Sequence, residues 1–286
     1  MPDIACINGK PMALDEARVP VSDRGFLFGD GVYEVVRTYG GLPFLLDAHL
    51  DRLDTSLGAI RLTPDWDREI LANWIAASLM QAGYAEAKIY IQVTRGVAPR
   101  EHAFPDTTTP TTLITVTPLT PLDSGLIANG VTAITTPDIR WKRCDIKSLN
   151  LLPNVLARQL ATEAGAFEAL FVTDEGLVSE GAGCNLFMVK NGALVTPGLS
   201  SRILAGVSRA HLLKTALNLG IEAHQRDITL SELLAADEVF FTGTTIEVVG
   251  VSRIDQTTIG SGAPGPVTRQ LAAAFRPAHA TALGGG

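Results

Sequence analysis

The residue types that could do chemistry are a lysine, a glutamate and two anion-binding turns in the second half of the chain. Lys147 lies in an apolar segment, and Glu180 follows in a strand-and-turn setting. Gly206–Arg209 has the form of a helix start, and Gly243–Thr245 is a hydroxyl-rich turn. An amine forms a Schiff base with an aldehyde, a carboxylate keeps a pyridine nitrogen protonated, and helix N-termini and hydroxyls bind phosphate. Together these are the parts that hold pyridoxal 5′-phosphate.

Lys147 taken alone would be read as a solvated surface charge, as most lysines are. Its apolar neighbours weaken that interpretation; they are Ile146, Leu149, Leu151 and Leu152. Desolvation lowers the pKa of an amine and favours the neutral form that attacks an aldehyde. We therefore expect Lys147 to be a reactive amine.

The other candidates each have an ordinary alternative. Glu180 could be an acid on a hairpin surface, but the small residues of Gly181–Cys184 beside it would let a planar ligand approach closely. Gly206–Arg209 could be a simple helix start, although the same free N–H groups would bind an anion, with Ser208 adding a hydroxyl. Thr244 and Thr245 could supply more hydroxyls.

Four further residues could bind anionic groups. Arg52 lies on a predicted amphipathic helix, where it is either an exposed charge or a phosphate clamp. Arg100 and His102 lie in a proline-containing loop and could hold a substrate carboxylate. Tyr33 could be core packing or a phenol that reaches the same carboxylate.

Composition and charge narrow the class of protein. The chain has 286 residues, 46% of them hydrophobic and 19% charged, which fits a globular enzyme of two domains. The net charge of −7 argues against a nucleic-acid partner. No run is long enough to span a membrane. The three cysteines are scattered and fit neither a disulfide framework nor a metal site, so we expect a cytoplasmic protein without a metal.

The pattern of elements predicts an α+β or mixed α/β fold. A helix is expected from a cap at Thr63 to about Gly83, followed by strands at residues 88–95 and 111–117. Strands and helices alternate after that, with a hairpin turn at Asn191-Gly192. We expect a small N-terminal α/β domain at residues 1–119, a linker at 120–125, a larger cofactor-binding domain at 126–280 and a flexible tail at 281–286.

Several of these segments resemble the fold-type IV pyridoxal-phosphate enzymes, and among them the bacterial D-amino acid aminotransferases. The matching stretches cover nearly the whole chain; they are Asp23–Glu34, His49–Leu53, Val93–Pro105, Asp138–Leu152, Glu180-Gly181 with Asn185, Ile203–Gly206, and Thr244-Thr245 with Glu247. The lysine segment and the Arg-x-His loop are the most specific. The resemblance implies a two-domain fold-type IV structure.

The resemblance also implies a role for each candidate residue. Lys147 would form the Schiff base and carry the proton, and Glu180 would pair with the pyridine nitrogen. The phosphate would be held by Arg52, Val207, Ser208 and Thr244, and Leu204 would pack on the ring. Tyr33, Arg100 and His102 would bind the substrate α-carboxylate, with the last two reaching across the interface of a homodimer.

Two departures from the family pattern remove hydroxyl groups near the cofactor. The serine-rich stretch expected after the glutamate is Ala182-Gly183-Cys184 here, and the serine expected before Thr244 is Gly243. Both changes bear on cofactor affinity more than on the type of reaction.

The implied reaction is ping-pong transfer of an amino group from a D-amino acid, such as D-alanine, to 2-oxoglutarate or pyruvate through an aminated cofactor. Relatives of the same fold offer three alternatives: a branched-chain L-amino acid aminotransferase, an (R)-amine transaminase and an aminodeoxychorismate lyase. Arg100 and His102 favour the D-amino acid enzyme among these. A non-catalytic carrier of the cofactor is a further alternative, which the intact lysine and glutamate disfavour.

Overall fold

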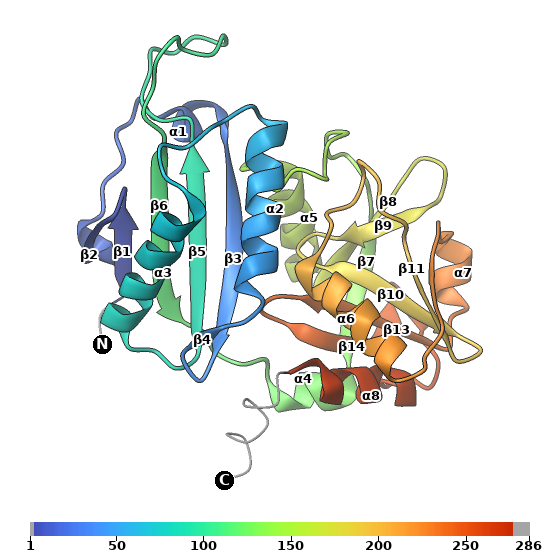
Figure 1. Cartoon of the computed structure of the whole chain (residues 1–286). Helices are drawn as coiled ribbons and strands as arrows, with labels where there is room; N and C mark the ends of the chain where they lie inside the picture. The colour runs from blue at the N-terminus through green and yellow to red at the C-terminus, as the bar shows by residue number, and fades with distance from the viewer. Residues whose placement is uncertain (1–2, 277–286) are drawn as a thin grey trace. The chain divides into compact units, whose positions relative to one another are not determined.

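The computed structural model describes residues 3–276 and divides the chain into two compact units (Figure 1). Among the described residues, unit 1 contains those up to 120 together with the short segment 146–150, and unit 2 contains residues 121–145 and 151–276. Each unit has its own sheet and its own apolar core. The mixture of helix and strand expected from the sequence is confirmed.

Unit 1 is built on an antiparallel six-stranded sheet of order β2-β1-β6-β5-β3-β4. The strands are β1 (Ile4–Ile7), β2 (Lys10–Ala13), β3 (Gly31–Tyr39), β4 (Leu42–Pro43), β5 (Ala87–Thr94) and β6 (Thr111–Pro118). The helices are the 3-10 turn η1 (Leu14–Glu16), α1 (Arg24–Phe28), α2 (Leu46–Ala59) and α3 (Arg68–Ala82).

Helices α2 and α3 cover one face of this sheet, as Figure 1 shows. Alternate residues of the strands, such as Val36, Ile89 and Ile91, are fully buried against Leu53 and Ile75 of the two helices. This is the period-two pattern of a sheet with one face on the core. The predicted strands at 88–95 and 111–117 are thereby confirmed as β5 and β6.

The predicted start of the helix after Thr63 is wrong. Helix α3 begins at Arg68, because the carboxylate of Asp67 accepts a hydrogen bond from the Ile70 N–H at 2.9 Å. The preceding segment stays in a loop because Trp66 is buried and donates from its indole nitrogen to Thr112 Oγ1 at 2.8 Å. The predicted end is confirmed, since Gly83 takes the left-handed conformation with φ 70°.

Unit 2 is built on a mixed sheet of order β12-β11-β10-β13-β14-β7-β8-β9, with β15 on β14. The strands are β7 (Val131–Pro137), β8 (Glu168–Val172), β9 (Val178–Gly181), β10 (Asn185–Lys190), β11 (Ala193–Thr196), β12 (Ala223–Gln225), β13 (Glu238–Gly243), β14 (Glu247–Ile254) and β15 (Thr257–Thr258). The helices are α4 (Ser124–Asn129), α5 (Leu152–Glu163), α6 (Val207–Asn218), α7 (Leu230–Leu234) and α8 (Pro266–Phe275).

The hairpin predicted at Asn191-Gly192 joins β10 to β11. Both turn residues have positive φ, 50° and 80°, as a two-residue turn between right-twisted strands requires. The long strands β10, β13 and β14 are buried on both sides and form the core of unit 2 around Leu186, Phe241 and Val249.

The domain division predicted from sequence treats each domain as one continuous stretch. In the structure the segment 146–150 packs with unit 1 although the residues on both sides of it belong to unit 2. Residues 124 and 125 of the predicted linker lie in α4, after the capping carboxylate of Asp123. The predicted tail at 281–286 lies outside the described residues.

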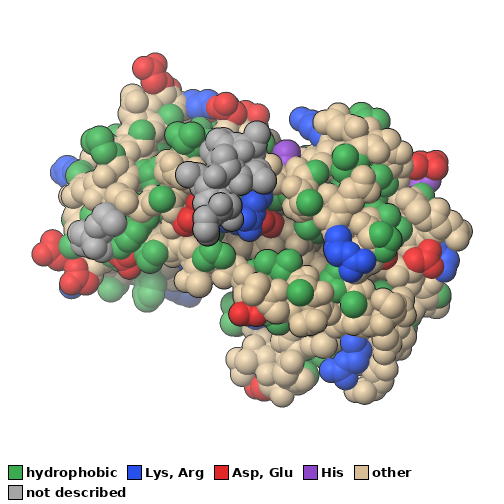
Figure 2. All heavy atoms as spheres, turned by 90° about the horizontal axis from the view of Figure 1, so that it is seen from below, with side chains coloured by type: hydrophobic (Ala, Val, Ile, Leu, Met, Phe, Trp, Pro, Cys, Tyr) green, Lys and Arg blue, Asp and Glu red, His purple; other side chains and the backbone are tan. Residues whose placement is uncertain are grey.

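Acidic and basic side chains are interspersed with apolar ones on the face drawn in Figure 2. None of the helices in the described range 3–276 combines the length and the apolar character needed to cross a membrane. Within the same range no three His, Cys, Asp or Glu side chains gather as a metal site would require.

Candidate active site

The backbone of Lys147 is fixed on the edge of the unit 1 sheet. Its carbonyl accepts from the Tyr33 N–H at 2.9 Å, and the Leu149 N–H donates to the Gly31 carbonyl at 3.1 Å, so the segment acts as a short extra strand beside β3. The Lys147 N–H also donates to Ser56 Oγ of α2 at 3.2 Å. A Cβ on Gly31 would lie 2.9 Å from Leu149 Cδ1, so glycine permits this close approach. The lysine is therefore held rigidly.

The amine of Lys147 lies over an aromatic ring. Its Nζ is 4.4 Å from the centre of the Tyr33 ring, and Tyr33 is in turn 5.7 Å from the ring of Tyr90. Burial raises the pKa of Tyr90 to about 12, and Tyr33 adds to this effect, so its phenol stays protonated. Unit 1 thus brings together Lys147, the predicted reacting amine, and Tyr33, the predicted substrate contact, whose roles stay predictions.

Arg52 is not an exposed helix charge. From α2 it donates through Nε and Nη2 to both oxygens of Glu34 at 2.7 and 2.8 Å, and His49 Nδ1 lies 2.8 Å from the same carboxylate. Glu34 is fully buried on β3. The fork of the guanidinium is thereby oriented by a carboxylate that the sequence did not single out.

This cluster changes the pKa of its members. Burial alone would raise the pKa of Glu34, but the hydrogen bonds from Arg52 and His49 outweigh it and lower the pKa from 4.5 to about 2. Burial lowers the pKa of His49, against the opposite effect of its bond to Glu34. Strand β3 therefore carries a fixed negative charge at the residue after Tyr33, and Lys147 is among the cations that stabilise it.

Arg100 and His102 lie in the exposed loop between β5 and β6. The loop is anchored by Arg24, which donates to the carbonyls of Glu101 and His102 at 2.5 and 3.4 Å and pairs with Asp30 at 2.8 Å. Both side chains lie beside the ring of Phe28. The Arg100 guanidinium is 5.3 Å and the His102 ring 5.6 Å from the centre of that ring. The backbone of the loop is thus held while both side chains remain accessible.

In unit 2, Glu180 lies near the end of strand β9 and forms an ion pair with a buried arginine. Arg140 Nη1 donates to Glu180 Oε1, and its side chain is only 4% exposed. Asn185 Nδ2 and the Leu204 N–H donate to the other oxygen, each at 3.2 Å. Arg140 is itself paired with Asp138 at 2.8 Å, which holds the pKa of that carboxyl below its usual range despite burial.

Arg140 and Asn185 are not among the site residues predicted from the sequence. Both lie in stretches that resemble the family, but neither contact with Glu180 follows from spacing along the chain. The signal available is an arginine in a partly apolar segment, which by itself indicates nothing more than a surface charge. The structure shows that Arg140 pairs with Glu180 and that Asn185 donates a hydrogen bond to it, so both residues orient the carboxylate.

Helix α6 begins as an anion-binding helix would. Its capping residue, Gly206, has no side chain to occupy the first N–H groups, and a Cβ there would lie 1.9 Å from Asn185 Oδ1. Val207 and Ser208 are buried in the first turn, and the Leu204 carbonyl accepts from Asn185 at 3.1 Å. Thr244 follows β13 in a half-buried turn.

The two departures from the family pattern have different surroundings. A Cβ on Gly243 would meet Ile246 at 3.4 Å, an ordinary contact, so the backbone would accept a serine there. Cys184 is packed tightly: its thiol lies 3.4 Å from Glu168, and a Cβ on Gly181 would lie 2.6 Å from its sulfur. Burial raises the pKa of Cys184, so the thiol is a neutral packing group.

The predicted site residues fall into two groups, one in each unit. Unit 1 brings together Lys147, Tyr33 and Arg52, with Arg100 and His102 in a loop of the same unit; unit 2 brings together Glu180, Leu204, Val207 and Ser208, with Thr244 in a turn after β13. The donor set fits pyridoxal 5′-phosphate: an anchored amine, a carboxylate for a pyridinium nitrogen, and a helix start without a side-chain cap for a phosphate. A Cβ at Gly206 would collide with Asn185 Oδ1, so glycine permits the close packing of Asn185 at this helix start.

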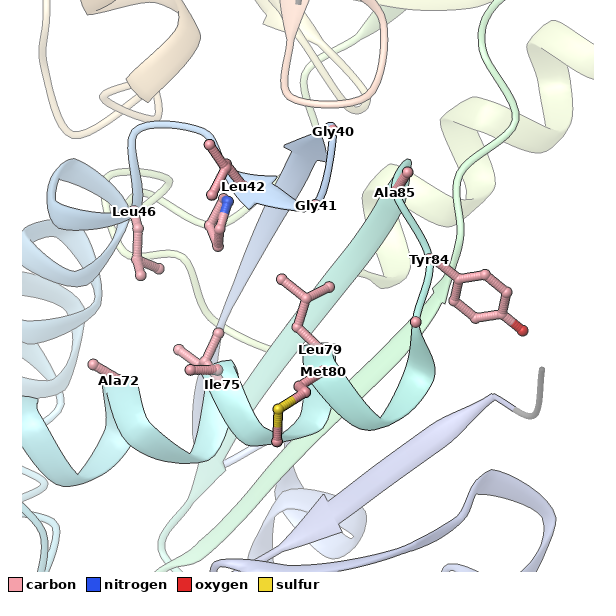
Figure 3. A pocket seen from close by; sticks show the side chains of 13 residues that line it. Gly40, Gly41, Leu42, Leu46, Ala72, Ile75, Leu79, Met80, Tyr84 and Ala85 are labelled. Atoms are coloured by element: carbon pink, nitrogen blue, oxygen red, sulfur yellow. The ribbon is translucent and has the colours of Figure 1, made fainter. Parts of the chain in front are cut away.

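A groove of about 550 Å³ on unit 1 is a different feature (Figure 3). It lies between α3 and the β3–β4 hairpin, and Leu42, Ile75 and Leu79 line it. No acid, base or thiol side chain lines it apart from the phenol of Tyr84. The groove therefore lacks the amine and the carboxylate that binding of pyridoxal 5′-phosphate requires.

Comparison with known proteins gives one consistent family. A family model described as amino-transferase class IV matches residues 31–254. The D-alanine aminotransferase of Bacillus licheniformis is 42% identical over 269 residues, 94% of each chain. The branched-chain amino acid aminotransferase of Escherichia coli superposes with a TM-score of 0.88 at 28% identity, over 95% of this chain and 92% of that one. The 4-amino-4-deoxychorismate lyase of Pseudomonas aeruginosa gives 0.82 at 30% identity, over 93% and 96%. The expected fold-type IV architecture is confirmed.

Proposed function

Because the chain belongs to the class IV aminotransferases, a pyridoxal-phosphate family, we propose that it transfers the amino group of a D-amino acid such as D-alanine to 2-oxoglutarate or pyruvate. We infer the class of amino donor from the 42% sequence identity to a D-alanine aminotransferase over nearly the whole chain. The identity to the branched-chain enzyme is lower, at 28%. The accessible Arg100 and His102 beside Phe28 support it, because two cationic or donor groups in one loop suit a carboxylate.

In this proposal one cofactor molecule draws on both groups of residues. Bound pyridoxal 5′-phosphate supplies an aldehyde that carries the amino group and a protonated ring that withdraws electrons from the reacting carbon. Arg52, the first turn of α6 with Val207 and Ser208, and Thr244 hold the phosphate. Leu204 packs on the ring.

The remaining residues act on the cofactor ring and on the substrate. Lys147 Nζ anchors the cofactor between turnovers and, once an incoming amine has displaced it, takes the proton from the substrate α-carbon. Glu180, which is paired with Arg140, keeps the ring nitrogen protonated. Tyr33, Arg100 and His102 bind the substrate carboxylate and decide which face of the α-carbon meets Lys147.

We also propose that the enzyme is a cytoplasmic homodimer in which Arg100 and His102 serve the partner's site. The free cysteines Cys6, Cys144 and Cys184 fit a reducing compartment. An apolar stripe on α5, described below, supports self-association.

A half-reaction tests the donor class. The holoenzyme is mixed separately with D-alanine, L-leucine and (R)-1-phenylethylamine, without an acceptor, and the visible absorption of the cofactor is followed. Only D-alanine should bleach it rapidly, and pyruvate should restore it. Bleaching by L-leucine or by the amine instead would contradict the proposed donor, and bleaching that no 2-oxo acid reverses would contradict transamination.

A Lys147→Ala variant provides the control for the assigned amine. Because no other residue is proposed to carry the proton, this variant should not sustain repeated turnovers. Multiple turnovers at a rate near that of the wild type would remove Lys147 from the role.

A further inference from the structure

Arg209 is a buried cation that the proposed function leaves unexplained. It occupies the first turn of α6 and is 3% exposed. Its Nη2 donates to the Pro197 carbonyl and to Gln225 Oε1, both at 2.9 Å, and its Nε has no hydrogen-bond partner. Among the described residues no carboxylate forms an ion pair with it.

The position of Arg209 is unfavourable for a positive charge. The N-terminal end of a helix carries a partial positive charge, so a cation in the first turn is repelled by its own helix. A buried charge without a counter-charge is strongly unfavourable for folding. Burial lowers the pKa of Arg209, yet a guanidinium remains charged at neutral pH. Folding therefore keeps an unbalanced cation at the start of α6.

Glu180 does not balance this charge. It is the carboxylate whose charge opposes the effect of burial on the pKa of Arg209, but among the described residues no ion pair joins the two side chains. The ion pair of Glu180 is with Arg140, and its other oxygen accepts hydrogen bonds from Asn185 and the Leu204 N–H. The counter-charge must come from elsewhere.

The surroundings of Gly206 suggest where an anion would lie. The helix start is uncapped, and Asn185 presses against Gly206 from strand β10. Thr242 pairs with Asn185 across β10 and β13, so its side chain lies on the same face of the sheet. The hydroxyl of Thr242 is fully buried and also lacks a hydrogen-bond partner. Two buried donors without partners therefore lie in the elements that meet at this helix start.

We propose that Arg209 is a positioning residue for the cofactor phosphate: its buried charge, fixed by Pro197 and Gln225, attracts the dianion to the first turn of α6. The inference rests on the proposed cofactor site and adds to it a residue that acts through the helix start. In this inference Arg209 has opposite effects on two forms of the protein: it destabilises the form without cofactor and stabilises the form that holds a phosphate.

The test uses full-length protein from which the cofactor has been removed. Thermal unfolding is measured with and without inorganic phosphate, and the dissociation constants of pyridoxal 5′-phosphate and of pyridoxal are measured by titration. The variants are Arg209→Gln, which removes the charge, and Arg209→Lys, which keeps it. Lys214→Gln is the control, because Lys214 is an exposed cation farther along the same helix.

Arg209→Gln should leave the melting temperature of the cofactor-free protein unchanged or raise it, and should reduce its stabilisation by phosphate. Its dissociation constant for pyridoxal 5′-phosphate should rise about tenfold while that for pyridoxal changes less than about threefold, since only the first ligand carries the dianion. Arg209→Lys should retain most of the preference for the phosphorylated form, and Lys214→Gln all of it.

A purely structural arginine predicts the opposite pattern. Loss of folding or a lower melting temperature in both Arg209 variants, with an unchanged ratio of the two dissociation constants, would overturn the inference. If the wild-type protein itself bound pyridoxal as tightly as its phosphate, the proposed phosphate site would fail regardless of Arg209. The donor substrate does not enter the measurement, so an error in the D-amino acid assignment would leave this result intact.

Discussion

At the scale of single residues, the site depends on carboxylates that are paired with buried cations. Glu34 is held by Arg52 and His49, and Glu180 by Arg140. Breaking such a pair by removing one partner leaves an uncompensated buried charge, which is strongly destabilising. These residues therefore link the chemistry of the site to the stability of each unit.

Glu34→Gln should destabilise the protein in a pH-dependent way. The pKa of Glu34 is lowered from 4.5 to about 2 in the folded protein, so its stabilisation is complete above pH 4.5 and is lost as the pH falls toward 2. The shift corresponds to about 3 kcal/mol at pH 7. Urea unfolding of wild type and variant at pH 7 and pH 3 should show a smaller difference at the lower pH.

Glu86→Gln is the matched control for this measurement. Glu86 pairs with Arg37 at 3.1 Å, but its side chain is 39% exposed, so its loss should cost less than about 1 kcal/mol. An equal cost of Glu34→Gln at both pH values would show that the loss comes from packing rather than from the ionised carboxylate.

Arg100→Ala should raise the KM for D-alanine by a factor of about ten or more, because a charge-assisted hydrogen bond to the carboxylate is lost. The visible absorption of the cofactor should persist, since Arg100 lies in an exposed loop of unit 1. Steady-state kinetics on D-alanine measure the effect. Arg18→Ala, which removes an exposed arginine bonded only to nearby carbonyls, should leave KM unchanged. An unaltered KM in Arg100→Ala would assign the carboxylate to other residues.

At the scale of elements, helix starts are decided by which side chain reaches the free N–H groups. Both Thr63 and Asp67 could cap a helix on residue type. Only Asp67 does so, because the residues between them are fixed by the burial of Leu62 and Trp66. The sequence thus offers a capping residue at both Thr63 and Asp67, and tertiary packing determines that the helix begins after Asp67.

Asp67→Ala should therefore lower the free energy of unfolding by about 1 kcal/mol, the usual cost of losing an N-cap. Thr63→Ala should change it by less than about 0.5 kcal/mol, because Thr63 is an exposed loop residue. Chemical denaturation of both variants gives the comparison. The reverse order would mean that α3 extends to Thr63 in solution.

At the scale of the whole molecule, an apolar stripe on α5 has no partner within the described chain. Leu152, Val155, Leu156 and Leu160 are 68%, 59%, 50% and 49% exposed, at the spacing of one helix face, while Ala157 and Ala161 pack inward. Large contiguous apolar patches on soluble proteins mark interaction surfaces. A second copy of the chain is the partner that the proposed homodimer supplies.

Leu156→Arg should weaken self-association. We expect the wild type to sediment at twice the chain mass of 30.3 kDa and the variant to shift toward a single chain at micromolar concentration. Leu217→Arg is the control, because Leu217 is 76% exposed on α6 and lies outside the stripe. A wild-type monomer, or a dimer equally sensitive to both changes, would contradict the role of α5.

Much of the architecture could be predicted from the sequence because its signals are local. The strands β5 and β6, the Asn191-Gly192 turn and the glycine end of α3 follow from side-chain alternation and from residues that accept positive φ. The sequence also showed a lysine, a glutamate and a helix start at Gly206, which are groups suited to binding one cofactor.

The pairings inside the site could not be predicted, because they join residues far apart in sequence. The segment around Lys147 becomes an edge strand only by bonding to β3, Arg52 is oriented by Glu34 rather than exposed, and Glu180 is paired with Arg140. From the sequence, Arg209 is an ordinary charged residue of a helix; only the structure shows that it is buried away from water. The sequence by itself determined which chemical groups are available, since these are covalent properties of single residues. Only the tertiary structure decided which charges meet and which remain unbalanced, because that depends on packing and on the loss of water.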